Sequence, residues 1–265
     1  MKTENQTVES SFPETVYHFD FKNFELWTLQ DKQSRMSADL FPDVDSVLLH
    51  RMMPEGDAES AINVFLVHKD NHYILFDAGL GAESGGALLD NLAAIGVSPT
   101  DVDVICITHC HRDHIGGMMT HDTAVFPKAV VYLSDKELEA FGQDEMTSKV
   151  QNAYQSRLQV FKAGDTIESC VETIEASGHT PGHIVYKMGD LYIIGDLIHA
   201  AALQIPYPDC CATYDNDAKQ AVATRKHFYR IFENNDVWAA GMHLPYSGVM
   251  HKFNIIQENE LELGK

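Results

Sequence analysis

Three histidines and an aspartate lie close together in the stretch THCHRDHIGG, residues 108–117. Imidazole nitrogens and carboxylate oxygens are the ligands with which proteins bind zinc and related divalent metals. Side chains two residues apart in an extended backbone point to the same side, so His109 and His111 can both reach one ion. A turn after them would bring Asp113 and His114 to the same cavity from another wall. The spacing therefore predicts two ligands for each of two neighbouring metal sites.

Three further candidate ligands follow other strand-like runs. His179 lies in ASGHTPGH, Asp196 ends LYIIGD, and His243 follows VWAAG. The alternative is a surface group of histidines without function, since the chain has 14 of them. Four ligand-type clusters at the ends of apolar runs favour one shared site over that alternative. Gly116 and Gly117 would let the backbone pass close to this site.

Runs with strand and helix periodicity alternate along the chain. The expected strands cover residues 64–68, 73–77, 102–108, 129–133, 170–176, 183–190, 191–196 and 237–241. The expected helices cover residues 87–96, 134–141 and 217–234. The tight turn KDN joins the first two strands, and the second helix opens with the capping-box pair Ser134 and Glu137. The alternation predicts an α/β architecture with helices outside sheet layers.

Length and composition predict one globular domain over residues 1–265, frayed over about residues 1–12. The formal net charge of −20 repels nucleic acid and anionic membrane surfaces, and no Lys/Arg cluster in the sequence overrides it. No apolar run reaches the ~20 residues of a membrane span, and the N-terminus lacks an apolar signal segment. We therefore expect a cytoplasmic protein with a small-molecule substrate that binds neither nucleic acid nor membrane. A homodimer remains open.

Five cysteines, none in a CxxC pair, predict free thiols rather than a disulfide framework or a thiolate zinc site. The adjacent Cys210 and Cys211 can pair or bind soft metals, but adjacent cysteines are more often small buried residues. The sequence leaves their role open.

These motifs, in this order, resemble those of the metallo-β-lactamase superfamily. The resemblance is carried by THCHRDHIGG, GHTPGH, GDLIH and GMH, preceded by ILFDAGLG, and covers about residues 60–245. It implies an αβ/βα sandwich of two mixed sheets flanked by helices, with the site along one edge.

The resemblance also implies a ligand set for two divalent ions. One ion would be held by His109, His111 and His179, and the other by Asp113, His114 and His243, with Asp196 bridging both. Ligands of nitrogen and carboxylate oxygen suit zinc first, with iron, manganese or cobalt as alternatives.

Three more residues match positions near such a site. Asp77 corresponds to an aspartate that holds a ligand imidazole in its tautomer, the alternative being a strand-end turn carboxylate. His183, the second histidine of HTPGH, corresponds to a hydrogen-bonded structural residue. His199 follows Asp196 by three residues, and either contacts a bound substrate or is a buried histidine beside the ligands.

Branches of the superfamily differ at identifiable positions. Asp196 stands where the thiolate-using β-lactamases carry a cysteine, and the glyoxalase-like branch uses C-terminal basic residues, of which only Lys252 and Lys265 lie beyond residue 230. The negative charge disfavours the RNA-processing branch. The acyl-homoserine lactonases carry a tyrosine in place of His199, whereas the group related to methyl parathion hydrolase carries a histidine there.

The resemblance therefore predicts a dinuclear metal-dependent hydrolase that cleaves an ester, lactone or related bond with a metal-bridging hydroxide. Asp113 or Asp196 would transfer protons, and His199 would steady the oxyanion or leaving group. An acyl-homoserine lactonase, an organophosphate or aryl ester hydrolase, and a metal-binding module without turnover are the alternatives. We expect loops around residues 31–60 and 203–216 to select the substrate.

Overall fold

The computed structural model of the chain describes residues 12–139 and 143–256. The expectation of a frayed start falls on residues outside these ranges, except for Phe12. The Phe12 ring packs edge-on against Trp27, with centroids 5.0 Å apart.

The described residues form two seven-stranded sheets and a short two-stranded ribbon. The first sheet has the order β1-β2-β3-β4-β5-β8-β9, antiparallel from β1 to β4 and parallel from β4 to β9. Its strands are β1 (Val16–Phe21), β2 (Phe24–Ser37), β3 (Asp57–Lys69), β4 (His72–Phe76), β5 (Val104–Cys106), β8 (Val130–Ser134) and β9 (Leu158–Phe161). The ribbon pairs β6 (Met119–Thr120) with β7 (Thr123–Ala124).

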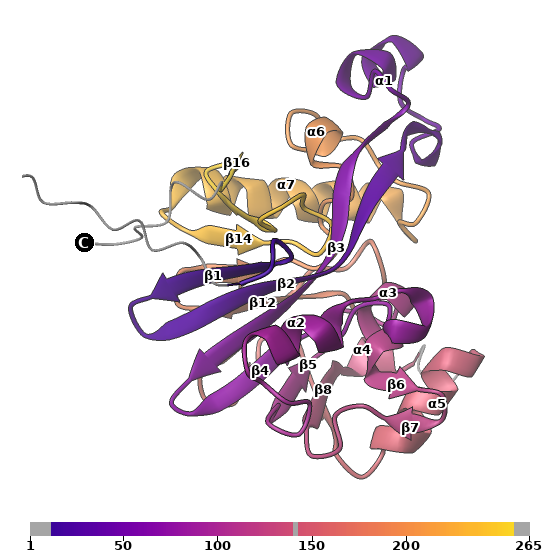
Figure 1. Cartoon of the computed structure of the whole chain (residues 1–265). Coiled ribbons are helices and arrows are strands. Elements are labelled where there is room, and N and C mark those ends of the chain that lie inside the picture. Colours follow the sequence, from indigo (N-terminus) through magenta and orange to yellow (C-terminus); the bar gives the residue numbers. More distant parts are fainter. Residues whose placement is uncertain (1–11, 140–142, 257–265) are drawn as a thin grey trace, which may run out of the picture.

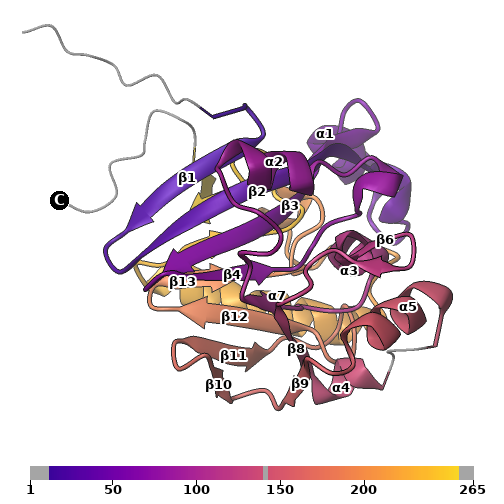
Figure 2. The same cartoon turned by 60° about the horizontal axis from the view of Figure 1, so that its bottom comes forward.

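The second sheet runs from β10 to β16 in chain order, and only the β13–β14 pair among its described strands is parallel. Its strands are β10 (Thr166–Ile167), β11 (Val171–Glu175), β12 (Ile184–Met188), β13 (Leu191–Ile193), β14 (Trp238–Ala240), β15 (Val249–His251) and β16 (Asn254–Ile255). Figure 2 shows β10, β11 and β12 side by side. The antiparallel series expected after residue 170 is confirmed.

Helices cover the outer faces of both sheets (Figure 1). The α-helices are α1 (Ser46–Met52), α2 (Leu88–Ala94), α3 (Arg112–Ile115), α4 (Asp135–Leu138), α5 (Glu145–Tyr154), α6 (Ala201–Gln204) and α7 (Ala218–Asn234). The 3-10 turns are η1 (Ala38–Leu40), η2 (Ala82–Ser84) and η3 (Gly116–Met118). Helix α7 begins at the N-cap Asp217, whose side chain accepts from Gln220 N.

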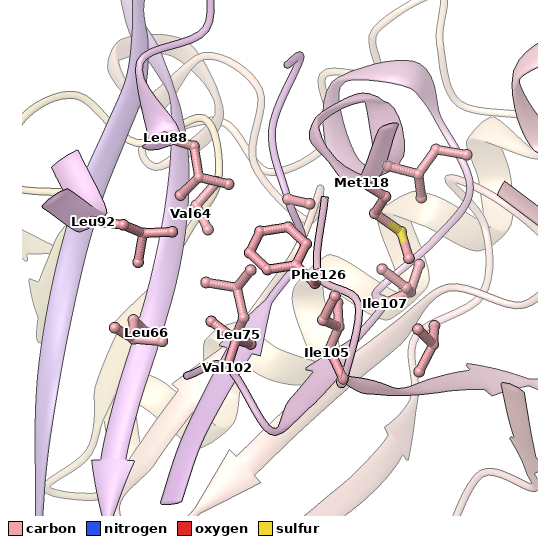
Figure 3. Close-up of a cluster of buried hydrophobic side chains, with 14 of the residues drawn as sticks. Val64, Leu66, Leu75, Leu88, Leu92, Val102, Ile105, Ile107, Met118 and Phe126 are labelled. Carbon is pink, nitrogen blue, oxygen red and sulfur yellow. The ribbon is translucent and has the colours of Figure 1, made fainter. Parts of the chain in front are cut away.

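Three apolar layers hold the sandwich together. Between the sheets, the rings of Phe76 and Tyr186 lie 5.5 Å apart. Outside the first sheet, Leu92 of α2 packs in one apolar cluster with Leu66 of β3 and Leu75 of β4 (Figure 3). Outside the second sheet, Phe232 of α7 packs against Tyr192. This layering of helices, sheet, sheet and helix confirms the expected αβ/βα sandwich.

Strand β3 shows why these residues form these elements. Residues 60–67 are buried without interruption, because a central strand between two covered faces presents mainly apolar residues on both. The turn to β4 uses Asp70 and Asn71 at φ 50° and 64°, the left-handed pair of a tight hairpin. The predicted KDN turn is therefore confirmed.

The expectation of loop structure over residues 31–60 is wrong for much of that stretch. Strand β2 continues to Ser37 and β3 begins at Asp57, so the two form a long arm that carries α1 at its tip (Figure 1). Met36 and Phe41 of this arm share an apolar cluster with Leu203 of α6. The arm is stabilised by residues distant in sequence, which local periodicity does not reveal. No helix among the described residues has the length and apolarity to cross a bilayer.

Candidate metal centre

Four loops at one edge of the sandwich bring the seven candidate ligands together. They follow β5 of the first sheet and β11, β13 and β14 of the second. Strands β11, β13 and β14 run in the same direction, so their carboxyl ends share an edge. The close approach that Gly116 and Gly117 were expected to permit is present, since a Cβ on Gly117 would lie 1.9 Å from Ala78 O.

The first ligand group consists of His109, His111, His179 and Asp196. His111 Nδ1 lies 3.0 Å from Nε2 of both other histidines, and those two Nε2 atoms are 3.2 Å apart. A tetrahedral zinc ion with Zn–N bonds of about 2.0–2.1 Å needs its nitrogens about 3.3–3.4 Å apart. The spacing of the three imidazoles therefore fits one such ion.

The second ligand group consists of Asp113, His114 and His243. Oδ2 of Asp113 lies 3.4 Å from Nε2 of His243 and 3.8 Å from Nε2 of His114. Among the described residues, the buried His114 Nε2 and Asp196 Oδ1 have no hydrogen-bond partner. Buried polar atoms rarely stay unsatisfied, so a cation fits between these groups.

Asp196 faces both groups. Burial raises its pKa, but His114 and His243 outweigh burial and hold the pKa well below its usual range. Burial, reinforced by the nearby His114, lowers the pKa of His109 well below its ordinary value. A neutral imidazole beside an ionised carboxylate is the donor set that divalent metals require.

Asp77 lies behind His114, at the end of β4. Its Oδ2 is 2.7 Å from Nδ1 of His114 and accepts from the Thr108 hydroxyl at the same distance, while its Oδ1 accepts from Thr108 N. Burial raises the pKa of Asp77 despite the neighbouring His114. The contact occupies Nδ1 of His114 and leaves its Nε2 directed at the second group.

His183 lies behind Asp196. Its Nε2 accepts from Asp196 N at 3.1 Å, and its Nδ1 lies 3.0 Å from Ala176 O. Burial lowers the pKa of His183 to about 3, so the ring is neutral and can donate through Nδ1. The side chain thus holds the backbone of Asp196 rather than pointing at the ligand groups.

His199 is buried beside the ligands. Its Nε2 lies 3.4 Å from Asp196 Oδ2, and its ring stacks on His243 at 5.6 Å. Neither ring nitrogen has a hydrogen-bond partner among the described residues. Its backbone N donates to the buried Gln204 Oε1 at 2.7 Å. The imidazole therefore has free hydrogen-bonding capacity next to Asp196.

Asp215 is a functional candidate that the sequence did not reveal. Its Oδ1 lies 3.0 Å from Nδ1 of His179, and Nη2 of the buried Arg225 lies 3.5 Å from its Oδ2. A ring nitrogen of His199 lies close to His179 and Asp215, so His179, His199 and Asp215 form a third ligand-type group. Arg225 already places a positive charge there, which disfavours a third cation. Asp215 sits in a loop without the strand-end pattern that marked the other residues.

A cavity of about 430 Å³ opens onto the two groups. One wall is apolar and consists of Met36, Leu40 and Ile62 from the β2–β3 arm and its surroundings. Ser34, Tyr214 and the exposed Arg35 and Arg112 also line the cavity. The cavity therefore combines an apolar wall with the face of the candidate metal centre.

The fold and the paired His/Asp groups fit a binuclear metal centre. The chain belongs to the metallo-beta-lactamase superfamily, whose family model matches residues 58–228.

Individual relatives lie on several branches of this superfamily. A hydroxyacylglutathione hydrolase of Aeromonas salmonicida (strain A449) is 29% identical over 140 residues, 51% of this chain and 46% of that protein. The chain spans about half the length of the curated relatives it matches. Two of the similar solved structures match 89% of this chain. The hydrolase AbOPH has a TM-score of 0.82 and 32% identity over 92% of its length. AidC, a dizinc quorum-quenching lactonase bound to the product N-hexanoyl-L-homoserine, has a TM-score of 0.80 and 27% identity over 94% of its length.

Proposed function

We propose that this protein hydrolyses an ester or lactone bond of a small molecule with an apolar acyl or aryl part. The observation that carries the proposal is the complete set of seven ligand-type side chains, arranged as two groups around Asp196 and facing a cavity. Zinc is the proposed metal, because the donors are imidazole and carboxylate and because the similar AidC is a dizinc enzyme.

Two divalent ions at this centre would lower the pKa of water towards about 7 and polarise the oxygen of the bond to be cleaved. His109, His111 and His179 would hold the first ion, and Asp113, His114 and His243 the second, with Asp196 shared.

Protons are handled by the carboxylates. Burial raises the pKa of Asp113, but His114 and His243 hold it below its usual value, so the group is ionised at neutral pH. Asp113 lines the cavity, where it can accept the proton of an attacking water and return it to the leaving oxygen. Asp196 is the alternative acceptor, and His199 can donate to the developing oxyanion through its free ring nitrogen.

The apolar side chains of Met36, Leu40 and Ile62 in the cavity lining favour a substrate with an acyl chain or aryl ring. An acyl-homoserine lactone fits this description and is supported by the product bound to AidC. Aryl and phosphate esters are the second candidate, since His199 occupies the position that carries tyrosine in the lactonase motif. The open cavity beside both ligand groups favours an enzyme over a metal-binding module without turnover.

The proposal is tested with protein stripped of metal and reloaded with zinc or with manganese. Its turnover of acyl-homoserine lactones, aryl esters, phosphotriesters and β-lactams should be compared with that of an Asp196→Ala variant. We expect turnover of lactones or aryl esters that requires two equivalents of metal and is lost in the variant. Protein that binds two equivalents and turns over none of the four classes would contradict the proposal.

A further inference from the structure

Glu137 of α4 carries a carboxylate that the sequence pattern assigns to a helix cap. The first half of that capping box is present, because Ser134 Oγ accepts from Glu137 N at 3.2 Å. The structure gives Glu137 no reciprocal bond to Ser134 N. Its side chain is instead buried, with 2% of the residue exposed, and reaches two loops outside its own helix.

Three donors converge on this carboxylate. Cys110 N donates to Oε2 at 3.0 Å, Gly182 N donates to Oε1 at 3.0 Å, and the Thr180 hydroxyl also donates to Oε1. A carboxylate that accepts from backbone N–H groups makes stronger hydrogen bonds than a neutral acceptor. Each buried N–H left without an acceptor would cost about 1–3 kcal/mol.

The donors lie beside the first ligand group and come from both sheets. Cys110 stands between His109 and His111, in the loop after β5 of the first sheet. Thr180 follows His179 directly, in the loop before β12 of the second sheet. Within the part of the chain that the structure describes, the Glu137 side chain makes no hydrogen bond to Asp113, His114 or His243 of the second group.

The approach of the two loops to α4 is close. A Cβ on Gly182 would lie 2.4 Å from Glu137 N, so only glycine fits there. On the other side of the same residue, Ser134 Oγ donates to Gly182 O at 2.8 Å. The start of α4 therefore holds Gly182 through both its N–H and its carbonyl.

We infer that Glu137 is a positioning residue for the first metal group, and that its carboxylate holds the two ligand loops at the spacing that one ion requires. The inference rests on the proposed function, since it assumes that this group binds a metal. It assigns Glu137 no contact with substrate. Its consequence is selective, because loss of the carboxylate should loosen His109, His111 and His179 and leave the second group intact.

Glu137→Gln is the sharpest test, because the two side chains have nearly the same size. A glutamine has one acceptor oxygen, so it cannot accept from both Cys110 N and Gly182 N at opposite ends of its amide. One of those N–H groups would then face an NH₂ group. Glu139→Gln, an exposed change in the same segment, is the matched control.

The measurement is zinc binding to metal-free protein in competition with a chromophoric chelator, which yields two stepwise constants. We expect Glu137→Gln to weaken one constant by about 10–100-fold, as is typical for residues that orient metal ligands, and to leave the other within about threefold. Glu139→Gln should change neither. Amide hydrogen exchange should accelerate at Cys110 or Gly182 in the metal-free variant. Thr180→Val removes a single donor and provides a milder version of the same selective loss, should Glu137→Gln fold poorly.

Zinc-binding constants and amide hydrogen exchange that both stay unchanged in Glu137→Gln would overturn the inference. An equal loss of zinc affinity at both sites would also overturn it. Failure of the proposed function has a different signature. In that case wild-type protein would hydrolyse no substrate, while its zinc constants and their response to Glu137→Gln could still be read. Protein that bound no zinc at all would contradict both.

Discussion

Asp196 Oδ1 lies 3.2 Å from Nε2 of His114. The other carboxylate oxygen, Oδ2, lies 3.4 Å from Nε2 of His179, so the single side chain faces a histidine of each ligand group. The two histidines come from loops of different sheets. Asp196 is therefore the one side chain among the described ligands whose loss is expected to open both groups together.

Asp196→Ala should reduce bound zinc from two equivalents towards zero under mild chelator competition, because both groups lose a shared oxygen and a compensating negative charge. Elemental analysis of protein purified without chelator measures this directly. The fold should persist, as circular dichroism can verify. Full metal content with full activity in this variant would show that Asp196 does not bridge.

His199→Ala should leave zinc content near two equivalents and lower kcat by about 10²–10³-fold, the usual effect of losing a general acid or oxyanion donor. Its ring nitrogens have no partner among the described residues, so the substitution breaks no hydrogen bond that supports a ligand. Loss of metal would instead make His199 a ligand or its support. Unchanged kinetics would make it a packing residue.

His199→Tyr addresses the choice of substrate. If this position sets the branch, the tyrosine should raise lactone turnover and lower turnover of aryl or phosphate esters, measured as kcat/KM on matched substrates. If the substrate preference of His199→Tyr equals that of the wild type, we expect the cavity residues Met36, Leu40 and Ile62 to select the substrate instead.

Asp215→Asn should weaken zinc binding at the first group by about 10–100-fold, because the amide can no longer accept at full strength from Nδ1 of His179. It also leaves the buried Arg225 without its carboxylate partner, so the melting temperature should fall. Asp209→Asn, which removes an exposed partner of Lys226 in the same segment, is the control. Equal zinc affinity in Asp215→Asn and Asp209→Asn would refute the role given to Asp215.

Zinc affinity should increase with pH between about 7 and 9. Burial lowers the pKa of His243, but Asp196 and Asp113 outweigh burial and raise it to about 9 in the metal-free protein. At pH 7 the ring is protonated, and zinc binds only the neutral imidazole, so binding must release this proton. The raised pKa also means that the metal-free fold is stabilised below about pH 6.5 and loses that stabilisation as pH rises through about 9.

Titration calorimetry in two buffers of different ionisation enthalpy counts the released protons. We expect proton release on zinc binding at pH 7.5, with the share that comes from His243 declining towards pH 9.5. Burial lowers the pKa of His114, but Asp196 and Asp113 outweigh burial and raise it well above its ordinary value, so this ring adds to the release. An affinity independent of pH across this range would contradict a protonated His243 in the metal-free protein.

The sequence determined the main elements and the candidate ligands, because both depend on local patterns. The period-two spacing of His109 and His111, the apolar runs before them, and the strand-end places of His179, Asp196 and His243 can all be read along the chain. Spacing alone predicted two ligands for each of two sites, and the resemblance added His179 to one group, His243 to the other and Asp196 to both. The structure brings these side chains together.

Only the tertiary structure decided what surrounds the ligands. Asp215 contacts His179, which lies 36 residues away in the sequence. Glu137 accepts hydrogen bonds from Cys110 and Gly182, which belong to loops of different sheets. The long β2–β3 arm likewise extends where we expected a substrate-selecting loop, and it packs on Leu203, which lies far along the chain. A buried carboxylate acquires its role from donors that the fold brings to it, and no local pattern records which donors those are.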